Sequence, residues 1–143
     1  MVPKLVEEKF KFGIKSLPYH ELGSIITEAK NDGSAVNRAR QRAAAYLDEG
    51  GSTLETDRAY LENCFLLEEV FRKIMDQENC RAITINGCMG TIMPLAETSA
   101  CMTLSLLNDA GYLAFCESDF VVIPAGMLLA NISGKPVFLN DPT

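Results

Sequence analysis

The second half of the chain alternates short apolar segments with segments of helical character, and this order restricts the fold more than any other feature. The expected elements are a strand over residues 81–85, a helix over 98–108, a strand over 112–116, a helix over 120–133 and a strand over 135–139. Strands that alternate with helices form parallel sheets with right-handed crossovers. We therefore expect an α/β fold, a three-layer Rossmann or flavodoxin-like domain with a mainly parallel sheet.

The first half of the chain is expected to be mostly helical. Residues 9–15 alternate apolar and charged side chains, which predicts one strand. Helices are expected over 21–31 and, with Ser34 as the N-cap, through Asp48. Residues 52–55 read Ser-Thr-Leu-Glu, the form of a capping box, and predict the start of a long helix that ends near residue 77.

Three arginines lie on the helix expected after Ser34. Arg38, Arg40 and Arg42 are two residues apart, and at about 100° per residue they do not share one helix face. A focused phosphate clamp is therefore not expected, and each arginine is expected to pair with an acid.

Composition excludes several classes of protein. The chain has 143 residues, of which 48% are hydrophobic and 22% charged, as in ordinary globular domains. Its net charge of -6 disfavours binding to nucleic acid or to an anionic membrane. No apolar run is long enough to span a bilayer and the N-terminus lacks an apolar signal core, so we expect a cytoplasmic protein.

The order of elements also suggests how the chain is organised. It stops directly after the last expected strand, with no helix to cover that strand. We therefore expect residues 20–143 to form one α/β domain of a multidomain protein, and residues 1–19 to be a linker or strand from a preceding domain.

The cysteines and the histidine do not point to a disulfide framework, a metal site or a catalytic triad. The five cysteines contain no CxxC pair, and their odd number favours reduced, mostly buried thiols. The five cysteines leave a thiol redox function open as one alternative for this chain. The single histidine, His20, is expected at the surface, which argues against a metal site or catalytic triad built on histidines within this chain.

The strongest candidate site follows the strand expected over 112–116. Ligands of open parallel sheets bind beyond the carboxyl ends of the strands, where this chain places Glu117 and Asp119. On an extended chain these two side chains point to the same side, and a cation relieves the repulsion between them. Oxygen ligands suit Mn²⁺ or Mg²⁺. The structural alternative is that Asp119 caps the next helix and Glu117 is solvated.

A third acid, Glu97, directly precedes the helix expected over 98–108. Its structural alternative is an acid in the first turn, stabilised by the helix dipole.

Four segments together resemble the middle domain of L-fucose isomerase-like proteins, of the fucose and arabinose isomerase superfamily. The segments are residues 82–88, 98–109, 111–119 and 132–141. They include a small-residue helix that ends in Leu-Asn-Asp and an apolar strand that ends in Cys-Glu-Ser-Asp. The resemblance implies an aldose-ketose isomerase that uses Mn²⁺ or another divalent cation.

The resemblance also implies roles for individual residues. In that family a Glu and an Asp of the middle domain and a His of a later domain hold the metal. Asp119 matches the Asp, Glu97 is the best match for the Glu, and Glu117 is its rival; Glu97 and Asp119 are then the catalytic candidates. The family's His has no counterpart here, because His20 precedes the motif.

The resemblance thus implies that the chain is the middle domain that supplies carboxylate metal ligands to a homo-oligomeric enzyme with a small-molecule sugar substrate, and we expect it to be inactive when isolated. The alternative is a non-catalytic α/β domain for carbohydrate sensing or subunit assembly.

Overall fold

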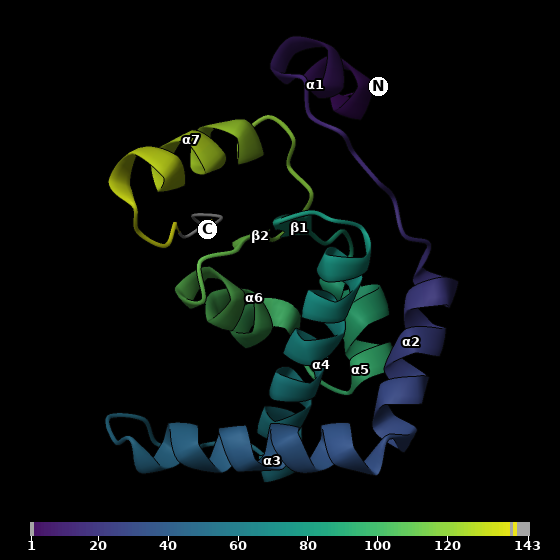
Figure 1. Ribbon diagram of the computed structural model, residues 1–143. Helices are drawn as coiled ribbons and strands as arrows, with labels where there is room; N and C mark the ends of the chain where they lie inside the picture. Colours follow the sequence, from purple (N-terminus) through teal and green to yellow (C-terminus); the bar gives the residue numbers. More distant parts are fainter. Residues whose placement is uncertain (1, 138, 140–143) are drawn as a thin grey trace.

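The computed structural model describes residues 2–137 and 139, and it shows a mostly helical chain around one pair of strands (Figure 1). The elements in chain order are α1 (Val2–Phe10), α2 (Tyr19–Asn31), α3 (Gly33–Asp48), α4 (Arg58–Gln77), β1 (Ala82–Thr84), the π-helical turn η1 (Cys88–Ile92), α5 (Met93–Ala96), α6 (Ala100–Asp109), β2 (Leu113–Phe115) and α7 (Ile123–Ser133). The predicted mixture of helices and strands is confirmed, although helices dominate.

The strands β1 and β2 pair in parallel, as predicted. Ala82 lies opposite Leu113 and Thr84 lies opposite Phe115. Helices lie on both sides of the pair, with α7 on one side and α4, α5 and α6 on the other (Figure 1). Within the described residues the sheet consists of these two strands.

The expected last strand is not formed in the part of the chain that is described. Residues 135–137 and 139 have no strand structure, and Phe138 lies outside the described residues. No helix among residues 2–137 has the length and apolar character needed to cross a membrane.

The predicted strand over residues 9–15 is wrong. The helix α1 ends at Phe10, and Lys11 follows in a left-handed conformation with φ of 60°. Val6 and Phe10 have helical spacing and Val6 is buried, so the helix gains apolar burial. A strand here would leave its backbone N–H and C=O groups without a paired strand.

The three predicted helices of the first half end where predicted, but each begins elsewhere; α2 begins at Tyr19, two residues earlier than expected. In α3 the N-cap is Asp32, whose Oδ1 accepts a hydrogen bond from Ser34 N at 2.8 Å, so the assignment of Ser34 is wrong. The capping box at 52–55 is also wrong, because α4 begins at Arg58. Leu54 packs instead against the cluster between α3 and α4, which draws this segment out of the helix.

The core is built around α4. Ala35, Ala39 and Ala43 of α3 are buried, and their small side chains let α3 pack closely on Leu61 and Phe65 of α4. On its other side α4 packs against α2, β1 and α6 in a larger apolar cluster.

The three arginines of α3 pair with acids of α4, as predicted. The pairs are Arg38–Glu69, Arg40–Glu62 and Arg42–Glu68.

Candidate functional site

Hydrogen bonds tie the carboxyl ends of the two strands together. Ser118 N donates to Thr84 Oγ1 at 3.0 Å, and Thr84 Oγ1 donates to Ser118 Oγ at 3.4 Å. On the neighbouring loop, Asn86 N donates to the hydroxyl of Tyr19 at 3.0 Å. The first residue of α2 therefore holds the loop that follows β1.

Two consecutive residues after β2 adopt the left-handed conformation, Glu117 with φ of 66° and Ser118 with φ of 45°. This conformation costs a non-glycine residue roughly 1–2 kcal/mol. It is maintained here by the bonds between Ser118 and Thr84. The expectation that the chain is extended between Glu117 and Asp119 is therefore wrong. Strained residues of this kind concentrate at functional sites.

Asp119 organises the turn that leads into α7. Its Oδ1 accepts a hydrogen bond from Val121 N at 2.9 Å, and its backbone carbonyl accepts from Ile123 N at 2.9 Å. The capping role considered from the sequence is thus present, although it serves the turn before α7. The second carboxylate oxygen, Oδ2, accepts no hydrogen bond from the residues that the structure describes.

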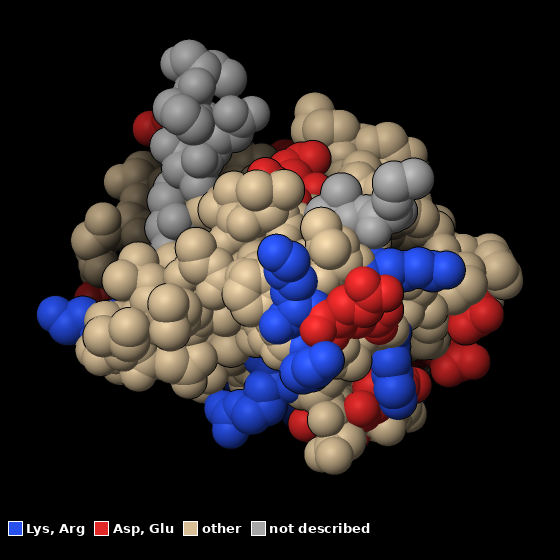
Figure 2. Space-filling model, turned by 90° about the horizontal axis from the view of Figure 1, so that it is seen from above, with Lys and Arg blue, Asp and Glu red and all other residues tan. Residues whose placement is uncertain are grey.

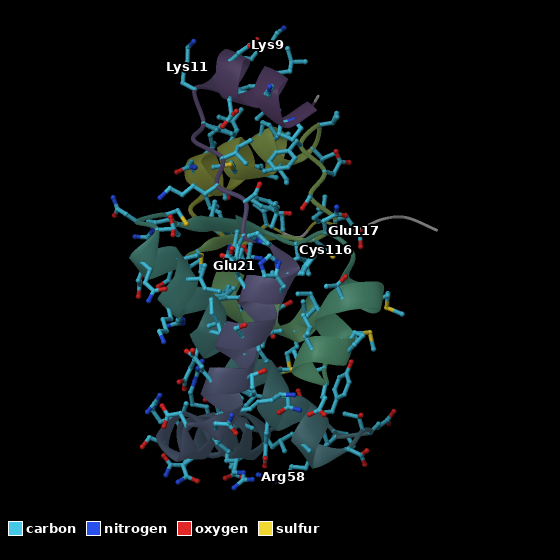
Figure 3. The ribbon with its side chains drawn as sticks, turned by 90° about the vertical axis from the view of Figure 1, so that its right-hand side faces the viewer. Lys9, Lys11, Glu21, Arg58, Cys116 and Glu117 are labelled. Carbon is cyan, nitrogen blue, oxygen red and sulfur yellow. The ribbon has the colours of Figure 1, made fainter. Side chains whose placement is uncertain are left out.

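Glu117 lies at the surface next to Cys116, at the level of the strand pair (Figure 3). The Cys116 thiol donates to Glu117 Oε1 at 3.6 Å. Burial, and then the negative charge of Glu117 and this hydrogen bond, raise the pKa of Cys116 to about 11. At neutral pH the thiol stays protonated and acts as a donor to the carboxylate.

Cys116 is therefore expected to react slowly with iodoacetamide at pH 8. With a pKa near 11 in place of about 9, about 100 times fewer thiols are ionised. The greater nucleophilicity of a high-pKa thiolate recovers about tenfold. We expect Cys116 to be alkylated about ten times more slowly than the exposed Cys101, as measured by mass spectrometry of peptides.

The variant Glu117→Gln should accelerate the alkylation of Cys116, because it removes the charge that disfavours the thiolate. Equal rates for Cys116 and Cys101 in the unmodified chain would contradict the described contact.

The other cysteines match the expected thiols in part. None of the five forms a disulfide, but Cys64 and Cys88 alone are fully buried, while Cys80 and Cys101 are exposed. The expectation of mostly buried thiols is therefore wrong. Burial raises the pKa of Cys64.

Glu97 lies in different surroundings from Glu117 and Asp119. It ends α5 in a left-handed conformation with φ of 54°, and its Oε2 accepts from Lys30 Nζ of α2 at 2.8 Å. This hydrogen bond and the charge of Lys30 lower the pKa of Glu97. The Glu97 carbonyl accepts from Asn63 Nδ2 of α4 at 3.4 Å. Glu97 thus bonds to α2 and α4, whereas Asp119 bonds to the start of α7.

The side chains capable of holding a metal remain dispersed in the described part of the chain. Among residues 2–137 and 139 no group of three or more His, Cys, Asp and Glu side chains is positioned to hold one ion. His20 is exposed, as expected, and its Nε2 lies 3.8 Å from Oε1 of Glu21. Glu117 and Asp119 together supply two carboxylates to the end of β2.

Sequence reasoning missed three residues that shape these sites, namely Tyr19, Lys30 and Thr84. Thr84 could have been found from the sequence. It lies near the end of a predicted strand, and parallel pairing of the two predicted strands brings their carboxyl ends to one edge of the sheet. Lys30 lies 67 residues from Glu97, and nothing in the sequence indicated that the two pair.

Comparison with known protein families, with curated proteins and with solved structures finds no significant match to this chain.

Proposed function

We propose that this chain is the carboxylate-bearing domain of a metal-dependent aldose-ketose sugar isomerase, similar to the middle domain of L-fucose isomerase-like proteins. One observation carries the proposal. Glu117 and Asp119 occupy a strained turn at the carboxyl end of a parallel strand, the position where α/β domains bind ligands. The strain is consistent with a turn kept for function, since glycine would adopt it at lower cost.

The donors at this turn are of the kind that Mn²⁺ accepts. Carboxylate oxygens are hard ligands, and Asp119 keeps Oδ2 clear of the turn that its Oδ1 caps. We infer that Asp119 and Glu117 would hold the ion and that Glu97, which is paired with Lys30, has the weaker claim. Two carboxylates leave coordination positions for sugar oxygens, water and a ligand from another domain or subunit.

The chemistry needs a proton moved between two adjacent carbon atoms of a sugar. A bound divalent cation would polarise the sugar oxygens and stabilise the charge that develops. In this proposal the Glu117 carboxylate accepts and returns the proton, and the Cys116 thiol orients it through its hydrogen bond. Asp119 holds the turn in place through Val121 N. A neutral sugar requires no basic pocket, which agrees with the acidic character of this end.

We also propose that the chain is part of a cytoplasmic homo-oligomer. Its domain would have a three-layer Rossmann-like fold with more strands than the two described. The helices on both sides of β1 and β2 support this arrangement (Figure 1).

The experiment is Mn²⁺ titration of the chain, followed by the loss of the free-ion electron paramagnetic resonance signal. We expect weak binding that Asp119→Asn and Glu117→Gln each weaken at least tenfold, about 1.4 kcal/mol. Glu28→Gln, an exposed acid on α2 without an ion pair among the described residues, is the matched control and should leave the affinity unchanged.

The same titration of the Glu97→Gln variant tests which of the two glutamates, Glu97 or Glu117, binds the ion. If Glu97→Gln weakens binding tenfold while Glu117→Gln does not, Glu97 is the ligand and our choice is wrong. Unchanged affinity in Asp119→Asn would remove this residue from the site and end the proposal.

The alternative, a non-catalytic domain for carbohydrate sensing or assembly, is favoured by a specific observation. Glu97 and Asp119 each have a structural task, as an ion-pair partner of Lys30 and as a cap before α7. Chemical-shift changes with L-fucose or L-arabinose in a chain that does not bind Mn²⁺ would support this alternative.

A further inference from the structure

The helix α7 and the residues just before it carry an uncovered apolar surface. Residues 120–134 contain no charged side chain. Within this stretch Val121 and Ile132 are each 75% exposed and Leu128 is 62% exposed. Figure 2 shows an expanse without acids, lysines or arginines over α7, with charged side chains gathered beside it over α1. A helix without charged side chains and with so many large apolar residues is normally buried over most of its surface.

Among the residues that the structure describes, neighbouring elements cover one side of α7. Ile123 and Pro124 are buried, and Gly126 lies so close to the ring of Phe115 that an added Cβ would be 2.7 Å from Cε1. This close approach fixes α7 on β2. The surface directed away from β2 consists of exposed apolar residues, which we call the α7 face: Val121, Val122, Leu128, Leu129 and Ile132.

The spacing of the exposed residues is that of a helix which packs on another helix. Within α7, Ala125, Leu128 and Ile132 are separated by three and four residues, and Val121, in the turn before α7, precedes Ala125 by four residues. Side chains with this spacing form a continuous row along one side of a helix and interlock with a similar row. Val122 and Leu129 widen the row on one side.

We propose that the α7 face is the contact between two copies of this chain. Each copy has a net charge of -6, so two copies repel one another wherever their charged surfaces meet. The α7 face has no charge of either sign, and two copies approach there with the least repulsion. A partner of different sequence is commonly selected by complementary charges, which this face does not offer. A two-fold contact needs only one self-complementary patch.

The size of the α7 face limits the affinity that we expect for the dimer. Helix α7 has 11 residues and is about 16 Å long. A stable interface buries roughly 800 Å² on each partner, which exceeds what a single short helix presents. The charged residues of α1 border the apolar centre, as at the rim of many interfaces (Figure 2). We therefore expect a reversible dimer with a dissociation constant in the micromolar range.

The test is sedimentation velocity of the full chain from about 1 to about 500 μM, a range that brackets such a constant. The mass is expected to rise from 15.7 kDa toward twice that value. The double variant Leu128→Glu/Ile132→Glu should weaken the dimer at least tenfold. Gln41→Glu/Ala45→Glu, which adds the same charges at the same spacing to exposed positions of α3, should not.

Charge complementation makes the test specific to this face. Leu128→Lys/Ile132→Lys should be monomeric alone and should form a heterodimer when mixed with Leu128→Glu/Ile132→Glu. If circular dichroism shows that either variant has lost helix, Leu128→Ser repeats the comparison without an added charge. A chain that stays monomeric at all concentrations, or a control that dissociates equally, would overturn the proposal whatever becomes of the metal site.

Discussion

Replacing Glu68 with alanine is expected to lower the free energy of unfolding by about 3 kcal/mol. Glu68 lies in the middle of α4 and is completely buried. Its Oε2 accepts a hydrogen bond from Arg42 of α3, and its Oε1 forms an ion pair with Arg72 one turn further along α4. Alanine removes both interactions and leaves a void in the packed interior.

Both arginines also stack on aromatic rings, so the loss should reach beyond α4. Arg42 lies over Phe65 at 5.2 Å and Arg72 lies over Tyr112 at 5.3 Å, which links α3 and the start of β2 to the same carboxylate. The guanidinium groups are partly exposed and water can solvate them, so the loss falls at the lower end of the range for broken buried pairs.

The measurement is urea unfolding followed by far-ultraviolet circular dichroism. Glu69→Ala removes the same charge from the neighbouring residue and breaks the more exposed pair with Arg38, so it should cost at most about 1 kcal/mol. Equal losses in the two variants would show that the buried carboxylate contributes no more than a surface pair.

The second large effect is expected from Gly126→Ala, which should destabilise the fold by about 1–2 kcal/mol. Alanine in a helix is ordinarily favoured over glycine by roughly 0.5–1 kcal/mol. Here the added Cβ would lie 2.7 Å from Cε1 of Phe115, and this ring is 2% exposed and cannot move aside. Forcing extra atoms into a packed interior costs about 1–3 kcal/mol and outweighs the gain.

Gly33→Ala supplies the control for this prediction. Gly33 begins α3, has no atom within 4 Å of a built Cβ, and does not have a positive φ. The substitution should be neutral or stabilising by up to about 0.5 kcal/mol in the same unfolding experiment. A Gly126→Ala variant that gains stability as Gly33→Ala does would mean that α7 is not fixed on Phe115.

The sequence predicted the helices over 21–31 and through Gln77 from local apolar patterns, and it predicted the parallel pairing of the two strands from the order in which strands and helices alternate. It failed at the N-terminus, where Phe10 fits both a strand and a helix. Burial of Val6 in the folded chain decides between them. The first turns of α3 and α4 failed for a related reason, since several residues in each segment are able to cap a helix.

At the candidate site the sequence predicted where the acids lie relative to the strands, but not their backbone conformation or the residues around them. Their position at the end of β2 follows from the order of elements. The left-handed conformation of Glu117 and Ser118 does not, because it is maintained by bonds to Thr84, 34 residues away from Ser118. The raised pKa of Cys116 likewise requires knowledge of its burial and of the contact with Glu117.

The apolar pattern along the chain is enough to predict most of the helices, the strands of the pair, and the two acids that follow the second strand. The fold shows which side chain each acid meets: Glu97 binds Lys30, Asp119 caps the approach to α7, and Glu68 lies between two arginines. Periodicity acts between residues a few positions apart, whereas ion pairs, strain and burial depend on segments that only the folded chain brings together.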